Sequence, residues 1–419
     1  MNSNHYKRTK ISCYYTYLAM SSVFSLPPLL FITFREMYGI SYTLLGTLVS
    51  VNFCTQLAVD LIFSFFTKHF NIHKTIKIMP LLTSFGLLIY ALVPLFFPQY
   101  AYIGFLIGTV IFALAAGLCE VLLSPLVAAI PSDNPKRDMS TLHSLYAYGV
   151  VSVIVVSTVF LKIFGTERWM YLTLFFALLP IISFILFCTS PLPEMNISNE
   201  KSSNGTKRKN FTLILFAFCI LLGGAAENTM TNWISTYMES VIQIPKVWGD
   251  IVGMAVFAVL IGLGRTVYAK YGKNISKVLV FGMTGSAICY LLVAVVSNAV
   301  VSIIACILIG LTTSMLWPGT LIMMEEKIPN PGVTAYALMA AGGDFGSSVA
   351  PQMLGAIVDL VSESSFAVSL GEKFSLTAEQ VGMKAGMLIA AIFPMIGIFV
   401  VIFLIRYFKK NSEPAISEN

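Results

Sequence analysis

The chain has 419 residues, of which 57% are hydrophobic and only 11% are charged, and its mean hydropathy is +0.82. This balance excludes an ordinary soluble globular protein and predicts an integral membrane protein. The net charge of +6 gives no reason to expect nucleic acid binding, because the basic residues gather on one side of the predicted spans.

Apolar runs long enough to cross a bilayer follow one another along the whole chain. A helix needs about 20 apolar residues to cross the bilayer core. Twelve such runs occur, at roughly 11–34, 42–66, 77–97, 101–129, 138–163, 168–190, 211–238, 245–269, 277–296, 299–327, 333–360 and 381–407. The sequence therefore predicts an all-α membrane protein with twelve transmembrane helices.

The loops between these runs set the expected orientation. With the N-terminus inside, 20 of the 26 lysines and arginines fall on the cytoplasmic side. We therefore expect a multi-pass protein of the cytoplasmic membrane with both termini in the cytoplasm. The seven cysteines lie singly inside predicted spans, which favours small core residues over disulfides or metal ligands, and no metal or cofactor is expected.

A polar stretch divides the spans into two groups of six. Residues 191–210 hold two prolines, a serine- and asparagine-rich run and a basic cluster, which is typical of a linker. We expect one six-helix bundle over 1–190, a cytoplasmic linker over 191–210 and a second bundle over 211–419.

A repeated motif relates the two bundles. The run GLCEVLLSP at 117–125 returns 193 residues later as GLTTSMLWP at 310–318, so that a glycine, two leucines and a proline recur in register while Glu120 becomes Thr313. The same offset pairs Gly149 with Gly342. These matches predict two pseudo-symmetric six-helix bundles that arose by duplication.

Twelve spans in two homologous halves, joined by a cytoplasmic linker, resemble the major facilitator superfamily. Its basic loop after the second and eighth spans is matched in the second half by Gly264, Arg265, Gly272 and Lys273, and only in part in the first half. The resemblance implies a transporter that works by alternating access.

Shorter motifs resemble the fucose:proton symporter branch of that superfamily. They are Gly117, Glu120, Ser124 and Pro125 in the fourth span, His143 and Tyr146 in the fifth, Glu227, Trp233 and Tyr237 in the seventh, Trp317 and Pro318 in the tenth, and Gly342, Gly343, Pro351, Gly355 and Asp359 in the eleventh. The first span departs from the branch, because it has Pro27 and Pro28 and no carboxylate. Fucose itself is therefore not implied.

Three acidic residues are expected near the bilayer midplane. Glu120 lies about 10 residues, or roughly 15 Å, from the end of its span, and Glu227 and Asp344 reach a similar depth from the second half. Acids inside a membrane usually serve transport pathways, with helix packing as the alternative role. We predict that these three acids couple transport to protons, with Glu120 as the main site and His143 as its relay partner.

Polar and aromatic side chains at similar depth are the expected substrate ligands. Asn52, Gln56 and Asp60 form one stripe on the second span, where Asp60 favours a structural role near the basic loop. Flat rings with a few carboxamides suit a neutral polyhydroxyl solute. The predicted substrate-binding residues are Tyr146, Asn52, Gln56, Asn228, Asn232, Trp233, Trp317 and Thr313.

A cytoplasmic gate is predicted from Arg265 with Glu325 or Glu326, together with Asp60. These charges would break and remake their pairs as the halves rock, and a static surface pair is the alternative.

The sequence thus predicts a proton-coupled secondary transporter, expected to act as a monomer, that imports a sugar or a related neutral small molecule. Sodium is the alternative coupling ion. Proton-driven efflux is a weaker alternative, because efflux antiporters typically carry a glycine and proline signature in the fifth span, whereas residues 145–160 have no proline. A membrane enzyme or sensor is disfavoured because the sequence shows no clustered nucleophile, base or metal set.

Overall fold

A computed structural model describes residues 3–66, 69–133, 135–193, 207–328 and 333–412, although at some positions in these ranges only the backbone is described. These residues are helical apart from short connections, with no strand among them, as the sequence predicts. They form two compact units. Unit 1 is residues 1–198 with 232–259, and unit 2 is residues 199–231 with 260–419.

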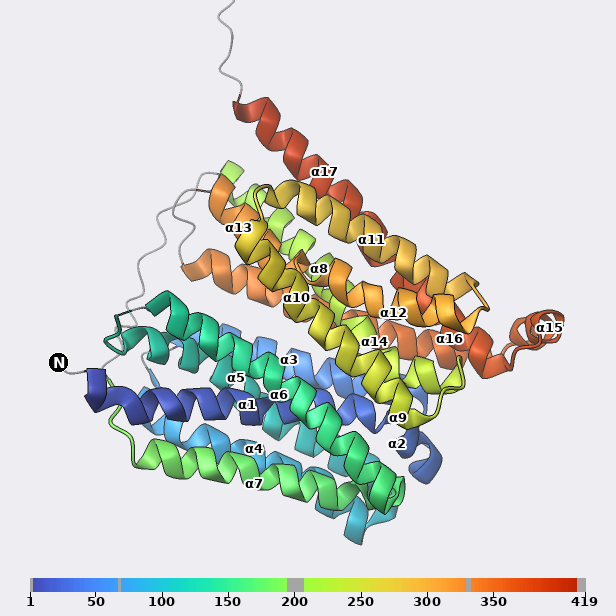
Figure 1. The fold of residues 1–419 in the computed structure, drawn as a ribbon, viewed down its shortest axis with the longest axis horizontal. Coiled ribbons are helices and arrows are strands. Elements are labelled where there is room, and N and C mark those ends of the chain that lie inside the picture. The colour runs from blue at the N-terminus through green and yellow to red at the C-terminus, as the bar shows by residue number, and fades with distance from the viewer. Residues whose placement is uncertain (1–2, 67–68, 134, 194–206, 329–332, 413–419) are drawn as a thin grey trace, which may run out of the picture. The chain divides into compact units, whose positions relative to one another are not determined.

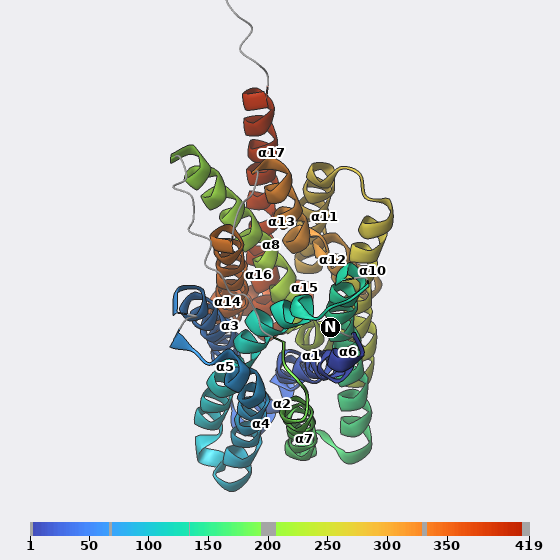
Figure 2. The same cartoon turned by 90° about the vertical axis from the view of Figure 1, so that its left-hand side faces the viewer.

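Unit 1 contains the first six spans, and Figures 1 and 2 show α1, α4 and α7 of this unit packed side by side. Its helices are α1 (Lys7–Leu29), α2 (Phe31–Tyr38), α3 (Tyr42–Phe66), α4 (Ile72–Phe96), α5 (Ala101–Ala129), α6 (Pro135–Phe164) and α7 (Trp169–Cys188), with single turns η1 (Ser3–Tyr6), η3 (Pro98–Tyr100) and η4 (Thr166–Arg168). The unit also takes in the second part of α8 (Lys207–Ser240), α9 (Lys246–Trp248), the π-helix η5 (Gly249–Ala255) and the start of α10 (Val256–Tyr271).

Unit 2 contains the rest of the second half. Besides the first part of α8 and most of α10, it holds α11 (Ile275–Val295), α12 (Ala299–Thr313), α13 (Leu316–Lys327), α14 (Val333–Ser362), α15 (Ser365–Phe374), α16 (Ala378–Ala390) and α17 (Ile392–Ser412). The compact units therefore divide α8 and α10 internally, whereas the predicted bundles divide the chain only at the 191–210 linker. Most of that linker, residues 194–206, lies outside the described residues.

Each of the twelve predicted spans has a helical counterpart. Nine described helices are long and apolar enough to cross a membrane, and two bent pairs, α1 with α2 and α14 with α15, raise the number to eleven. The shorter apolar stretch Tyr148–Phe164 of α6 corresponds to the fifth predicted span. The prediction of an all-α membrane protein with twelve transmembrane helices is confirmed.

The duplicated glycines make the same kind of contact in both halves. A Cβ at Gly149 of α6 would lie 2.7 Å from the carbonyl oxygen of Leu18 in α1, and one at Gly342 of α14 would lie 2.6 Å from that of Ala217 in α8. Any side chain at either position would push the two helices apart. The repeat seen in the sequence is therefore a repeat of close helix crossings.

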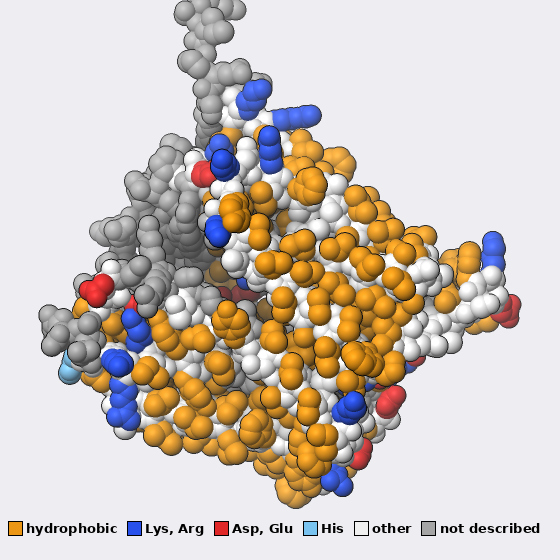
Figure 3. Space-filling model, viewed as in Figure 1, with side chains coloured by type: hydrophobic (Ala, Val, Ile, Leu, Met, Phe, Trp, Pro, Cys, Tyr) orange, Lys and Arg blue, Asp and Glu red, His pale blue; other side chains and the backbone are white. Residues whose placement is uncertain are grey.

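The membrane-facing surface can be read from α7. Tyr171, Phe175, Leu178, Ile182 and Ile185 recur every three to four residues and are each about half exposed. Such an apolar stripe is stable only against lipid. Hydrophobic side chains likewise cover most of the face in Figure 3, and lysines and arginines lie toward its edges.

The first span is broken where the sequence places two consecutive prolines. Pro27 and Pro28 lie in the last turn of α1, and the axis bends by 51° between α1 and α2. Proline removes a backbone donor and crowds the preceding turn, which explains the break. Beyond the break, Phe34 stacks on Phe105 at 4.2 Å and meets Trp169 edge-on, so that aromatic packing fixes α2 in place.

Candidate functional site

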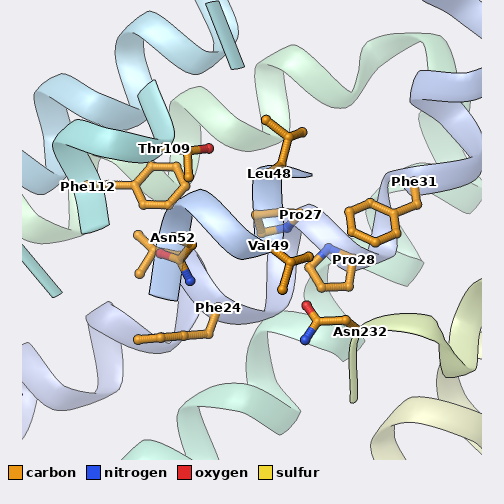
Figure 4. A pocket seen from close by; sticks show the side chains of 11 residues that line it. Phe24, Pro27, Pro28, Phe31, Leu48, Val49, Asn52, Thr109, Phe112 and Asn232 are labelled. Atoms are coloured by element: carbon orange, nitrogen blue, oxygen red, sulfur yellow. The ribbon is translucent and has the colours of Figure 1, made fainter. Parts of the chain in front are cut away.

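The break in the first span forms one wall of a pocket inside unit 1 (Figure 4). The pocket encloses about 290 Å³ of empty space, its open mouth included. Helices α1, α3, α5 and α8 and the start of α2 contribute the lining, which consists of Val23, Phe24, Pro27, Pro28, Phe31, Leu48, Val49, Asn52, Thr109, Phe112 and Asn232. The lining is aromatic and aliphatic, with two carboxamides and one hydroxyl and no charged side chain.

Asn52 contributes a buried polar atom to this pocket, its carboxamide oxygen, which has no partner among the described residues. Its side chain is 8% exposed, and its Oδ1 atom is buried without a hydrogen bond to any described residue. A buried amide that makes no hydrogen bond loses its hydration without compensation, at a cost of about 1–3 kcal/mol. Because Asn52 also lines the pocket, a bound molecule with polar groups could restore the missing hydrogen bonds.

The predicted polar stripe on the second span is buried along its length. Gln56 is 2% exposed and Asp60 is 9% exposed, so that with Asn52 the stripe does not face lipid. The Nε2 atom of Gln56 lies 3.5 Å from the carbonyl oxygen of Asn52, and Gly117 of α5 packs closely against the Gln56 backbone. Of the three residues, only Asn52 lines the pocket.

Asn232 reaches the same pocket from α8, and Figure 4 shows the two carboxamides entering it from different helices. Both asparagines are substrate ligands predicted from the sequence, and the structure brings them together. Tyr146 lies behind this lining, with its ring edge-on to that of Phe24 at 5.7 Å. Trp233 is fully buried, 5.4 Å from the Phe31 ring and 5.7 Å from the Tyr42 ring, and so supports the wall from behind.

Glu120 lies on α5, the helix that also carries the pocket residues Thr109 and Phe112. Its side chain is exposed, unlike the buried neighbours Ala116 and Cys119. Thr109 and Glu120 are eleven residues apart, which is three helical turns, so they lie on one face of α5 about 16 Å apart. The side chain of His143 lies outside the described part of the chain.

In unit 2, Arg265 pairs with Glu227, a partner that was not predicted for it from the sequence. Arg265 donates from Nη2 to Oε1 of Glu227 at 3.0 Å and from Nε to the carbonyl oxygen of Ser314 at 3.0 Å. Oε2 of Glu227 is buried and makes no hydrogen bond to a described residue. Of the two glutamates expected to pair with Arg265, Glu326 is exposed and the side chain of Glu325 lies outside the described residues.

Other predicted ligands in unit 2 pack against one another across α8, α13 and α14. Asn228 donates to the hydroxyl of Ser347 at 2.8 Å, and Asp344 on the same helix as Ser347 is 8% exposed. The indole of Trp317 packs against α14 at Gly343. A Cβ at Gly343 would overlap the indole, so this contact requires glycine. Thr313, the counterpart of Glu120, is fully buried and donates to the carbonyl oxygen of Ile309 at 2.8 Å.

A further acid, Asp250, was not singled out from the sequence. It is fully buried in the π-helix η5 and accepts from Ser235 at 2.5 Å and from Thr158 at 3.3 Å. The ammonium group of Lys246 lies 3.5 Å from its Oδ1 atom and also donates to the carbonyl oxygen of Leu29 at 2.5 Å. The available signal was an acid four residues after a lysine inside an apolar run.

Twelve membrane-spanning segments, a largely apolar pocket with two carboxamides, and ion pairs within the spans define an all-α integral membrane protein. The family model of the Major Facilitator Superfamily matches residues 14–351, and the chain belongs to this superfamily. No curated protein is matched by the sequence.

Solved transporter structures share the fold at low sequence identity. A bacterial homologue of the human lysosomal transporter Spinster, inward-facing and occupied, superposes with a TM-score of 0.78 at 12% identity, covering 99% of this chain and all of the homologue. The nucleoside transporter NupG gives 0.68 at 17% identity, with 97% and 100% covered. The fucose:proton symporter of E. coli gives 0.61 at 11% identity, with 96% and 99% covered.

Proposed function

We propose that this protein is a proton-coupled secondary transporter of the cytoplasmic membrane that imports a small neutral solute, a sugar or a related compound, by alternating access. Membership of the superfamily supports transport rather than enzyme chemistry. Both termini lie in the cytoplasm in this proposal, as the distribution of basic residues predicts. The solute class and the coupling ion do not follow from the family and rest on features of this chain.

The observation that carries the solute class is the unsatisfied carboxamide of Asn52 in an uncharged pocket. A charged solute would enter this lining without an opposite charge to compensate it, at a high desolvation cost. A neutral solute with hydroxyl groups can hydrogen-bond to Asn52 and Asn232 while its apolar face rests on Phe24, Phe31 or Phe112. A sugar ring has both properties.

Coupling is assigned to Glu120 because of its place on α5. The acid is exposed in a span that also lines the pocket, and it lies on the same helix face as Thr109. If protonation of Glu120 lets α5 move against its neighbouring helices, the pocket wall formed by Thr109 and Phe112 moves with it. The charged form of an acid is costly inside a membrane, so protonation of Glu120 would lower the free-energy cost of moving α5.

The solute proposal is tested by a thermal-shift screen of the purified protein against hexoses, pentoses, nucleosides and amino acids. We expect at least one sugar to raise the unfolding temperature, because a ligand that binds only the folded state stabilises it. Asn52→Leu keeps the branched shape and removes the carboxamide, and should abolish that shift. Asn298→Ser is the matched control, since Asn298 caps α12 and is not among the pocket residues. A charged amino acid as the best ligand, or an unchanged shift in Asn52→Leu, would refute the proposal.

Glu120→Gln tests the coupling in proteoliposomes loaded with the solute found in that screen. We expect a pH gradient to drive accumulation by the unmodified protein and not by the variant, while solute exchange without a gradient persists. A sodium gradient at constant pH serves as the second arm. Accumulation driven by sodium alone, or uphill transport by the variant, would show that Glu120 is not the proton-coupling site.

A further inference from the structure

The loop that connects the last two spans of unit 2 is itself a helix, α15, turned almost at right angles to its neighbour. The axis of α15 (Ser365–Phe374) is bent by 82° from that of α14, and Figure 1 shows it at the end of α14. Ser364 caps its start by accepting from the amide of Ala367, and Ser375 ends it in a left-handed conformation. These caps make α15 a defined element rather than a frayed end of α14.

The connections to α15 are too short to let it leave the membrane surface. Two residues, Glu363 and Ser364, join it to α14, and residues 375–377 join it to α16. Each extended residue spans at most about 3.6 Å, so both ends of α15 stay within about 11 Å of the span ends. The 30 residues of α14 are about 45 Å long, enough to reach the headgroup region. A helix perpendicular to α14 at that level runs along the bilayer surface.

The side chains of α15 separate into two faces. Phe366, Leu370 and Phe374 follow one another at four-residue intervals and so form one apolar stripe. Phe366 is 63% exposed and Phe374 is 55% exposed. The exposed polar residues Ser365 and Glu372 lie on the opposite face together with Val368, which is 54% exposed, while Ser369 and Lys373 lie at the border between the two faces.

A third set of residues attaches α15 to unit 2. Ala367 and Gly371 are buried, and a Cβ at Gly371 would lie 2.5 Å from the carbonyl oxygen of Leu376. Packing within the unit therefore covers only this third side, and leaves the apolar stripe uncovered along with the polar residues. Leu360, in the last turn of α14, is likewise apolar and 74% exposed.

We propose that α15 is an in-plane interfacial helix that binds the lipid headgroup region at the Ser362 end of α14, with Phe366, Leu370 and Phe374 inserted toward the acyl chains. Aromatic rings are favoured at this depth, and the long side chain of Lys373, beside Phe366 at the border of the stripe, can reach up to phosphate groups. A lipid partner follows from the position, because the short connections hold the stripe at the level where lipid surrounds the spans.

Tryptophan substitution tests the proposal in nanodiscs of phosphatidylcholine and phosphatidylglycerol. In Phe366→Trp and Leu370→Trp, the fluorescence gained over the parent protein should be quenched about twofold more by lipids brominated near the headgroup than by soluble iodide. Glu372→Trp, on the opposite face of the same helix, is the matched control and should show the reverse order.

Two other results would overturn the proposal. Iodide quenching of Phe366→Trp and Leu370→Trp as strong as that of Glu372→Trp would place the stripe in water. Shielding of both from iodide and from brominated lipid would place the stripe against protein, either a second copy of the chain or another partner. A variant that does not fold is replaced by its neighbour on the stripe, since each position reports separately.

Discussion

Among the described residues of the spans, the Lys246–Asp250 and Arg265–Glu227 ion pairs have different surroundings. In unit 1 the carboxylate of Asp250 is fully buried, with two hydroxyl donors and the ammonium group of Lys246 around it. In unit 2 the carboxylate of Glu227 meets Arg265 at 3.0 Å, but Arg265 is 47% exposed and Oε2 of Glu227 has no partner among the described residues. Both carboxylate oxygens of Asp250 have partners, whereas only Oε1 of Glu227 has a partner among the described residues.

This difference separates a structural pair from one that can change partners. Breaking the Asp250 cluster would leave a buried charge and several buried donors unsatisfied at once, so its contacts are expected to persist during the transport cycle. In the Glu227–Arg265 pair, Glu227 is only 14% exposed and has one oxygen without a partner among the described residues, but Arg265 is 47% exposed and can exchange its contacts for water at low cost. We therefore expect Asp250 to act in stability and Glu227 to act in transport.

The largest effect is expected from Asp250→Ala. Removing one partner of a buried ion pair leaves the other charge uncompensated, so the unfolding free energy should fall by about 3–5 kcal/mol. The loss should appear as a lower unfolding temperature of the purified protein in detergent. The double variant Asp250→Ala with Lys246→Met removes both charges and should recover most of it. Equal stability of Asp250→Ala and the parent would remove the basis for calling this pair structural.

A smaller effect is expected from Ser235→Ala, which removes the hydroxyl that donates to Asp250 at 2.5 Å. A hydrogen bond to a charged group contributes about 1.5–3 kcal/mol, and the unfolding free energy should fall by that amount. The adjacent Thr236 provides the control, because its hydroxyl is buried without a hydrogen bond to a described residue. Thr236→Val should leave stability unchanged or raise it. If both variants lose stability equally, the hydroxyl of Ser235 has no special role.

The fold could be predicted from the sequence because hydropathy reports directly on membrane spans. The predicted run 277–296 corresponds to α11 (Ile275–Val295), and 211–238 to α8 (Lys207–Ser240). Hydropathy does not report backbone breaks, however. The run 11–34 contains the 51° bend after Pro27 and Pro28, and the run 299–327 contains the interruption between α12 and α13.

The candidate site was predictable only where a single helix carried the signal. Asn52 was identified because a polar residue in a span needs a non-lipid neighbour, and this reasoning uses one helix. The pairing of Arg265 with Glu227 joins α10 to α8, and no periodicity within one span encodes such a pair. Asp250 was overlooked because it lies five residues into its predicted span, where an acid resembles an ordinary interfacial residue.

The smallest effect on stability, and the most informative for transport, is expected from Glu227→Gln. The variant keeps an acceptor for Arg265, and the charge left unpaired is that of Arg265, which is 47% exposed, so the unfolding free energy should change by less than about 1 kcal/mol. Solute uptake into proteoliposomes should nevertheless fall, because the charge that Arg265 exchanges is gone. Glu326→Gln, an exposed glutamate on α13, is the matched control and should transport normally. If Asp250→Asn blocks transport and Glu227→Gln does not, the two assignments are reversed. The buried Asp250 cluster would then move during transport, and the Glu227–Arg265 pair would stabilise unit 2.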